Sequence, residues 1–307
     1  MGNAFFFPWE VSLITSIQDR LSDFGVTVMS LISALGEQMI MVFFLAVFYL
    51  WIDKDFGKKM GMTIIVGSVF NAFFKNIFLR KRPYMASDSI KCLKPVEKGA
   101  DIYDPTVQGF SFPSGHSTNG MLCYGSMGLR ANRIWQKIIL FSVVVLIGIS
   151  RFALGVHYPT DVLFGFILAA VVMVVFDVLY HKYSFERACL IFAGVGAIGF
   201  LFAKSTDYYT SYGLLIGTSL GFFFEKKLVN FKRPKAWYFG VLRVAAAIGL
   251  FYALNTVLKL PFDKEFLESA GFLSYLVRTL RYAVTTFVIT GLYPLTFRLG
   301  DRIGHKK

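Results

Sequence analysis

The sequence contains several apolar stretches of about 20 residues, the length that crosses a bilayer as an α-helix. Residues 162–176, VLFGFILAAVVMVVF, include no charged side chain. Of the 307 residues, 55% are hydrophobic and 17% are charged, whereas a soluble domain usually carries about 25% charged residues. A single soluble domain of this length could not bury so much apolar sequence. The pattern therefore excludes a soluble globular enzyme and a disordered chain, and it predicts a polytopic helical membrane protein.

The apolar stretches predict nine membrane helices, at residues 36–52, 57–79, 114–130, 136–152, 159–180, 187–204, 209–225, 236–258 and 271–297. Residues 9–34 mix apolar and polar positions and predict an amphipathic helix at the interface. The expected fold class is all-α, a transmembrane helical bundle in three parts. These parts are an N-terminal interfacial segment (1–35), a transmembrane core of six helices (36–205) and about three additional C-terminal helices (206–307).

The distribution of charge predicts the orientation of the chain. The loops around 53–56, 131–135, 181–186 and 226–235, together with the C-terminal tail, carry more than half of the 32 lysines and arginines. Because cytoplasmic loops are enriched in basic residues, the N-terminus is expected outside and the C-terminus in the cytoplasm. The long connection 80–113 then faces the outside. The net charge of +13 fits this pattern, and no basic stripe with interleaved aromatics predicts nucleic-acid binding.

Three polar clusters lie at the outer ends of the predicted helices, and the first holds Lys75 and Arg82. Their separation of seven residues is about two helical turns, so both cations would lie on nearly the same helix face. Two cations at a membrane surface suit a phosphate, although a basic helix end is a common structural feature. The pair is a weak signal by itself, because Lys226 and Arg233 repeat its spacing on the cytoplasmic side.

The second cluster is Pro113-Ser114-Gly115-His116, just before the third predicted helix. Ser114 is a good N-cap, and Gly115 lets a ligand approach the backbone closely. Free N–H groups at a helix start bind anions, and His116 would then stand beside the anion as a proton donor or acceptor. The alternative interpretation is a plain helix cap with an interfacial histidine.

The third cluster joins Arg151, at the end of the fourth predicted helix, to His157 and Asp161, at the start of the fifth. A carboxylate four residues after a histidine can accept from one ring nitrogen and leave the other free as a nucleophile. The alternative is an Arg151–Asp161 ion pair that joins two helices, with His157 a bystander in the turn.

Together the clusters bring three cations, two histidines and one aspartate to one face of the membrane. Three positive charges in a small volume require an anion, and phosphate is the natural candidate. On this face of the membrane, no third histidine and no cluster of Cys or Glu completes a metal-ligand set, since His181 and His305 lie on the predicted cytoplasmic side. The residues therefore predict phosphoryl transfer through a histidine, with neither a metal nor a cofactor.

In order and in internal spacing, the three clusters resemble the signature of the type 2 phosphatidic acid phosphatase (PAP2) superfamily. The matching segments read KNIFLRKRP at 75–83, PSGH at 113–116 and SRFALGVHYPTD at 150–161. The resemblance covers about residues 57–180 and implies a PAP2-like membrane core of six helices. The chain departs from that core in its three further helices. Its nine-span plan is similar to that of glucose-6-phosphatases and of longer bacterial PAP2 proteins.

The resemblance implies a role for each matching residue. His157 would attack phosphorus and form a phosphohistidine, which Asp161 would orient and stabilise. His116 would protonate the leaving oxygen and then activate water. The residues that would hold the phosphate oxygens are Lys75, Arg82, Ser114, Gly115 and Arg151.

The expected function is an integral membrane phosphatase that hydrolyses a lipid phosphate or diphosphate monoester without a metal, at the outer face of a bacterial plasma membrane. Candidate substrates are phosphatidic acid, phosphatidylglycerophosphate, polyprenyl diphosphates and sphingoid phosphates, and no partner is expected beyond these and membrane lipids. Three alternatives remain: a phosphotransferase, a phosphatase of a water-soluble ester, and a non-enzymatic lipid-phosphate binder or transporter. The His157–Asp161 pair favours an enzyme, because binding alone needs only the cations.

Overall fold

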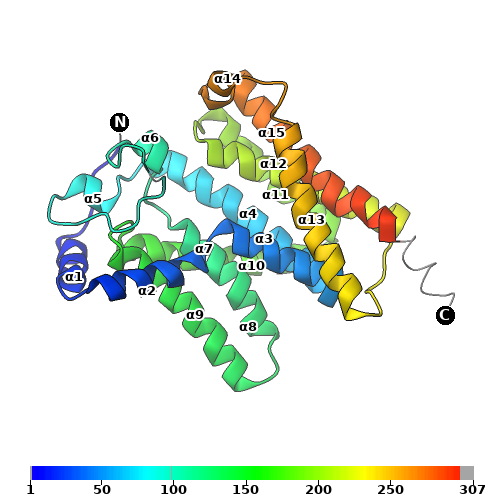
Figure 1. Cartoon of the computed structure of the whole chain (residues 1–307), viewed down its shortest axis with the longest axis horizontal. Coiled ribbons are helices and arrows are strands. Elements are labelled where there is room, and N and C mark those ends of the chain that lie inside the picture. The colour runs from blue at the N-terminus through cyan, green and yellow to red at the C-terminus, as the bar shows by residue number, and fades with distance from the viewer. Residues whose placement is uncertain (1, 98, 298–307) are drawn as a thin grey trace. The chain divides into compact units, whose positions relative to one another are not determined.

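The computed structural model describes residues 2–97 and 99–297, and helix makes up 76% of it (Figure 1). The predicted all-α class is confirmed. In the described part of the chain, extended pairing is limited to an isolated bridge between Asn3 and Arg80. The predicted cytoplasmic tail after residue 297 lies outside the described residues.

Four helices are long and apolar enough to cross a membrane, and each matches a predicted span: α4 (Lys54–Phe78), α9 (Ile134–Ala153), α10 (Pro159–Lys182) and α13 (Trp237–Val257). A fifth candidate joins α2 (Asp23–Ala34) to α3 (Gln38–Val47) and η1 (Phe48–Ile52) across a 44° bend. The predicted interfacial helix 9–34 is thus two helices, α1 (Pro8–Gln18) and α2. Ser22 starts the second helix by accepting a hydrogen bond from the Gly25 N–H at 3.2 Å.

The count of nine spans is not confirmed by length and composition. The four remaining predicted spans are helical, but turns of π- or 3₁₀-helix divide them, or polar residues lower their hydropathy. They correspond to α7 (Gly115–Gly120) with η2 (Met121–Gly125) and α8 (Ser126–Arg130); α11 (Phe185–Ala197) with η3 (Ile198–Leu201); α12 (Thr206–Phe224); and α15 (Phe272–Phe287) with η5 (Val288–Leu292) and η6 (Tyr293–Thr296).

The contacts divide the chain into two compact units, each built from separate stretches of sequence. Unit 1 comprises Met1–Met41 and Phe70–Val175, and unit 2 comprises Val42–Val69 and Phe176–Lys307. The division into 1–35, 36–205 and 206–307 stays a prediction. The C-terminal end of α4, most of α10 from its N-terminus, and the whole of α9 belong to unit 1, together with the long loop between α4 and α7.

In unit 1 a small hydrophobic core holds that long loop, which carries α5 (Pro83–Ala86) and α6 (Pro105–Gln108), beside α1 (Figure 1). The residues of this core come from α1, from the loop and from the turn between α9 and α10: Ile14, Tyr84, Ile90, Leu154, Val156 and Tyr158. Each is at most 4% exposed. Burial of such side chains stabilises the loop by roughly 1.5–3 kcal/mol for each large residue. The loop is therefore packed against the same turn that carries His157.

Unit 2 is held at one end by a buried carboxylate. Glu225, the first residue of η4 (Glu225–Val229), accepts hydrogen bonds from Lys54 Nζ at 2.7 Å and Lys58 Nζ at 2.9 Å. Its Oε1 also accepts from the Phe231 N–H at 3.0 Å. A buried charge is stable only when paired in this way, so Glu225 fixes α4 against the end of α12.

Close backbone contact joins α12 to α15 in unit 2. Gly213, Gly217 and Gly221 recur every four residues on α12. A methyl group added to Gly217 would overlap the carbonyl oxygen of Ala283 in α15. Small residues at this spacing let two membrane helices approach closely, because no side chain separates their backbones. By contrast, a methyl group added to Gly249 of α13 would meet nothing within 4 Å.

We expect Gly217→Ala to destabilise the protein by about 1–3 kcal/mol, because the two helices must separate to admit the methyl group. Gly249→Ala is the matched control, and it should stabilise α13 by about 1 kcal/mol through helix propensity alone. Thermal unfolding of both purified variants in detergent checks the pair. Equal apparent Tm values for the two variants would contradict the close α12–α15 contact.

Candidate active site

The chain leaves α4 through one residue in the left-handed backbone region, at the start of the long loop. α4 ends three residues after Lys75, Leu79 has a φ of 49°, and Arg80 pairs with Asn3 in the isolated bridge. Arg82 then lies in extended backbone, with φ −67° and ψ 154°. The expectation that Lys75 and Arg82 share one helix face is therefore wrong, because the helix ends between them.

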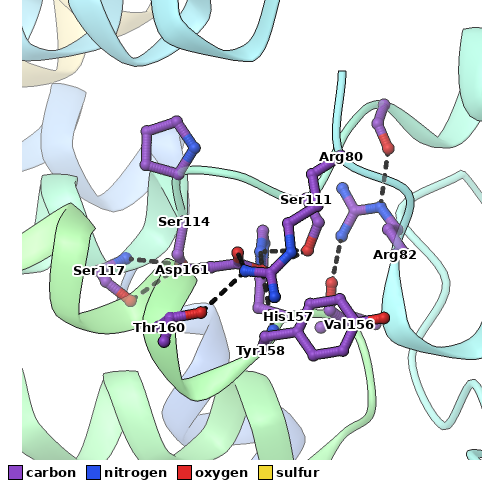
Figure 2. A network of polar contacts seen from close by, with 12 residues as sticks. Arg80, Arg82, Ser111, Ser114, Ser117, Val156, His157, Tyr158, Thr160 and Asp161 are labelled. Carbon is purple, nitrogen blue, oxygen red and sulfur yellow. Dashed lines mark hydrogen bonds and ion pairs between the residues drawn. The ribbon is translucent and has the colours of Figure 1, made fainter. Parts of the chain in front are cut away.

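Arg82 ties the long loop to the turn that carries His157. Its Nε donates to the carbonyl oxygens of Gln108 and Gly109, both at 3.0 Å, and its Nη1 donates to the Val156 carbonyl at 2.8 Å (Figure 2). The side chain is buried. The guanidinium therefore reaches the predicted site from the loop and not from a helix.

The turn between α9 and α10 positions His157. Gly155 adopts a φ of 76°, and its missing side chain lets the Lys91 carbonyl and the Gln18 amide approach its backbone. The His157 N–H donates to the Arg151 carbonyl at 3.3 Å. The turn is thus held from the long loop, from α1 and from the last turn of α9.

His157 faces two oxygen atoms through one ring nitrogen. Its Nδ1 lies 3.5 Å from Asp161 Oδ2 and 3.4 Å from Ser111 Oγ (Figure 2). The Ser111 hydroxyl donates to the same carboxylate oxygen, which also accepts from the Tyr158 N–H at 2.8 Å. An Nδ1–H facing these acceptors leaves Nε2 with its lone pair, which is the form of a nucleophilic histidine.

His157 is 2% exposed. Burial lowers the pKa of this imidazole well below its ordinary value of 6.5, and the positive charges of Arg82, Arg151 and Lys75 add to the effect. Its pKa therefore keeps the side chain neutral at pH 7.

Asp161 is held by an arginine that the sequence motifs do not single out. Arg80 donates through Nη1 to Asp161 Oδ1 at 2.5 Å and through Nη2 to Glu10 Oε2 at 2.9 Å. Glu10 Oε1 accepts from the Thr160 hydroxyl at 2.6 Å, and the Arg80 guanidinium lies 4.0 Å from the centre of the Tyr158 ring. All three charged side chains are buried. A continuous chain of ion pairs thus runs from α1 to the partner of His157.

Ser114 caps α7 as predicted. Its hydroxyl oxygen accepts from the Ser117 N–H at 3.4 Å, and its own N–H donates to the Asp161 carbonyl at 3.0 Å. Gly115 and the partly exposed His116 are the first two residues of α7. This helix start is therefore fastened to the first turn of α10, where Asp161 lies.

Arg151 lies buried in the last turn of α9. Its Nη1 donates to Ser33 Oγ in α2, and its Nε has no hydrogen-bond partner within the described residues. Asp161 pairs with Arg80, so the alternative of an Arg151–Asp161 pair is not what the structure contains. Lys75 lies partly buried in the last turn of α4. In the part of the chain that is described, no three His, Cys, Asp or Glu side chains gather as metal ligands.

Sequence reasoning missed Glu10, Arg80 and Ser111. Arg80 lies inside the segment KNIFLRKRP, and Ser111 lies two residues before Pro113. Their spacing in sequence gives no reason to connect them with Asp161. The one available signal was Glu10, a lone carboxylate in the aromatic and apolar start of the chain, where burial requires a partner.

Comparison with known families gives two matches along the chain. The PAP2 superfamily matches residues 56–185, which include all three clusters, and the family described as PAP2 superfamily phosphatase, transmembrane extension, matches residues 209–302. The second match agrees with the prediction of additional C-terminal helices. No solved structure matches the chain.

Three curated proteins are similar to part of the chain. The lipid A 4′-phosphatase of Porphyromonas gingivalis is 32% identical over 136 residues, which cover 43% of this chain and 52% of the relative. The undecaprenyl-diphosphatase BcrC of Bacillus subtilis is 27% identical over 148 residues, covering 47% and 70%. Phosphatidylglycerophosphatase B of Bacillus subtilis is 42% identical over 84 residues, covering 24% and 41%.

The chain thus spans about half the length of the first of these relatives. The two family matches lie in sequence order, and together they cover most of the chain. The chain is an integral membrane protein of the PAP2 superfamily, with the superfamily's domain at residues 56–185 and its transmembrane extension at residues 209–302.

Proposed function

We propose that this protein is a phosphatase of lipid phosphate or diphosphate monoesters that works through a phosphohistidine and without a metal. The observation that carries the proposal is the buried His157, whose Nδ1 faces Asp161 and Ser111 while its burial, and then two buried arginines, lower its pKa. A neutral imidazole oriented by a carboxylate is a competent nucleophile at pH 7.

The reaction begins when His157 Nε2 attacks phosphorus and the bond from phosphorus to the lipid oxygen breaks. The Nδ1–H donates toward Asp161 and Ser111 as positive charge develops on the ring. His116, at the start of α7, gives a proton to the leaving oxygen. It then takes a proton from water, and the attack of that water on the phosphohistidine releases inorganic phosphate and restores His157.

The phosphate oxygens bind to a set of donors around this nucleophile. Arg82, Arg151 and Lys75 supply positive charge, and all three contribute to the field at His157. The Ser114 hydroxyl and the Gly115 N–H supply hydrogen bonds at the start of α7. The buried Arg151 Nε, which lacks a partner in the described residues, is suited to a substrate oxygen.

The substrate class is a lipid whose phosphate group reaches the membrane surface. The three similar proteins are named for lipid A, undecaprenyl diphosphate and phosphatidylglycerophosphate. A membrane-embedded chain offers a lipid direct access from the bilayer, which supports this class over a water-soluble ester.

The proposed location is a bacterial plasma membrane, with the site at the outer face and the C-terminus in the cytoplasm. The excess of basic residues in the loops opposite the site supports this orientation.

Glu10 and Arg80 act as positioning residues in this mechanism. Arg80 holds one oxygen of Asp161, which leaves the other oxygen for the His157 side. Glu10 accepts from the second edge of the guanidinium, so that Arg80 is held in one place in the interior.

We expect His157→Ala to lower phosphate release by at least about 1,000-fold, because the nucleophile is lost while the cations remain. The assay follows phosphate released from a panel of lipid phosphates and diphosphates by purified protein in detergent with EDTA. Binding of inorganic phosphate, measured by its inhibition of labelled lipid binding, should persist in the variant. Wild-type activity in His157→Ala would overturn the phosphohistidine.

Arg80→Met should lower kcat by about 10–100-fold with little change in KM, because Asp161 loses its anchor while the phosphate-binding cations are intact. Arg80→Lys keeps the charge and should recover part of kcat. Lys81→Met, a neighbour whose side chain contacts neither carboxylate, is the matched control. A rise in KM at constant kcat for Arg80→Met would instead assign Arg80 to substrate binding.

The orientation is tested with two exposed loop positions of unit 1 in a Cys92→Ala background. Ser89→Cys, in the long loop, should react with a membrane-impermeant maleimide in intact cells. Asn132→Cys, between α8 and α9, should react only after lysis, because its loop is on the proposed cytoplasmic side. The reverse pattern would put the site on the cytoplasmic face.

A further inference from the structure

Two arginines lie one turn apart on α15 of unit 2, outside the site described above. Arg278 and Arg281 are separated by three residues, so their side chains leave neighbouring positions on the same side of the helix. Arg281 is only 6% exposed, and Arg278 is partly buried. Two like charges are thus held close together and largely away from water.

Neither guanidinium has a carboxylate partner within the described residues. Arg281 Nη2 donates to the Asn255 side-chain oxygen at 2.9 Å and lies 3.5 Å from the Asn255 carbonyl oxygen. Arg278 Nη2 donates to the Leu267 carbonyl, in α14 (Lys264–Glu268), at 3.3 Å. A guanidinium carries five N–H donors. The contacts described above use only Nη2 of each arginine, so they occupy a small part of the donors of either side chain.

Three buried donors at this place have no partner in the described part of the chain. They are Arg278 Nε, Arg281 Nε and the hydroxyl of Thr285. Thr285 follows Arg281 by four residues, which puts it on the same helix face one turn further on, and it is 1% exposed. A buried donor without an acceptor costs about 1–3 kcal/mol, and more when it is charged.

Two other buried arginines of the described chain, Arg80 and Arg82, are compensated. Arg80 lies between two carboxylates, and Arg82 donates to three carbonyl oxygens. Arg281 resembles Arg151 instead, since each is buried, has one neutral side-chain partner and keeps Nε unpaired in the described residues. Desolvated positive charge of this kind requires a negative group to complete it.

We propose that Arg278 and Arg281, together with the Asn255 amide and the Thr285 hydroxyl, bind a phosphate-type oxyanion in unit 2. The unpaired groups are all donors, so the ligand must offer several acceptor oxygens and negative charge. Planar guanidinium groups bind phosphate oxygens in pairs, which suits this class. A phospholipid headgroup and free inorganic phosphate share this chemistry. The site is independent of the reaction proposed at His157.

The test counts bound ligands on the full-length protein by native mass spectrometry in detergent. One arm adds phosphatidylglycerol, a phosphodiester that the proposed phosphatase reaction does not consume, and a second arm adds inorganic phosphate. Phosphatidylcholine is the zwitterionic reference. The variant Arg278→Gln/Arg281→Gln should lose the unit 2 binding event, with at least tenfold weaker binding of the effective anion there, while phosphate bound by the cations around His157 is retained. Loss in the first arm identifies a lipid headgroup, and loss in the second identifies a soluble anion.

The matched control is Arg133→Gln/Arg187→Gln, which removes two positive charges from exposed positions of the chain. It should bind both probes as the wild type does, because general attraction to the surface is not the proposed cause. Equal binding by the wild type, the control and Arg278→Gln/Arg281→Gln in both arms would overturn the site.

Asn255→Asp keeps the test decisive if the double variant does not fold. The new carboxylate would replace the amide oxygen 2.9 Å from Arg281 Nη2 and supply a permanent counter-charge. We expect a higher apparent Tm without added anion, and at least tenfold weaker anion binding. A higher Tm with unchanged binding of both probes would show that Arg281 needs a counter-charge but binds no ligand, and it would overturn the proposal.

Discussion

A guanidinium in the interior of unit 1 needs acceptors for the donors on both of its edges, because no bulk water reaches it there. Arg80 meets this condition through Asp161 on one edge and Glu10 on the other. Without either carboxylate, one edge of the guanidinium would lose its acceptor. Without Arg80, two buried carboxylates would have no counter-charge, which typically costs several kcal/mol. The start of the chain, the end of α4 and the start of α10 are therefore fixed by one another. The partner of His157 is held by this arrangement, so the N-terminal helix contributes to the site without supplying a catalytic residue.

The long loop between α4 and α7 is ordered for a similar reason. Its hydrophobic residues pack against the turn after α9, and Arg82 links its backbone to the residue before His157. Gln108 strengthens the loop from within, since its amide oxygen accepts from the N–H groups of Val96 and Glu97. A loop of this length is commonly functional, and here it supplies Arg82 and Ser111.

Cations in the described interior differ in what they contact. The buried Arg80 and the half-buried Lys54 and Lys58 beside Glu225 have carboxylate partners. Arg151 and Arg281 keep donor atoms without partners in the described residues, in unit 1 and unit 2 respectively. Because a buried charge is expensive in an apolar medium, unmatched donors mark the places where a ligand can complete the interaction.

Hydropathy predicted much of the fold. The four longest apolar helices and the all-α class were predicted within a few residues, since a bilayer demands about 20 apolar residues per span. The count of nine membrane spans was not confirmed, because hydropathy does not show where a helix bends or changes to π-helix. The contact of Gly213, Gly217 and Gly221 with the backbone of α15 was not predicted from the sequence. The spacing of Lys75 and Arg82 gave the wrong prediction that both lie on one helix face, because α4 ends between them and Leu79 leaves the helical conformation.

The sequence by itself determined the class of protein and the residues of the three clusters, because motif spacing and apolar length are local properties. It gave His157 and Asp161 as a pair, since four residues across a helix start bring the two side chains together. Only the tertiary structure decided which cation holds Asp161, and that Glu10 and Ser111 join it from 151 and 50 residues away in sequence. Buried ion pairs are formed by packing between distant segments, and no local pattern specifies which carboxylate a given arginine will meet.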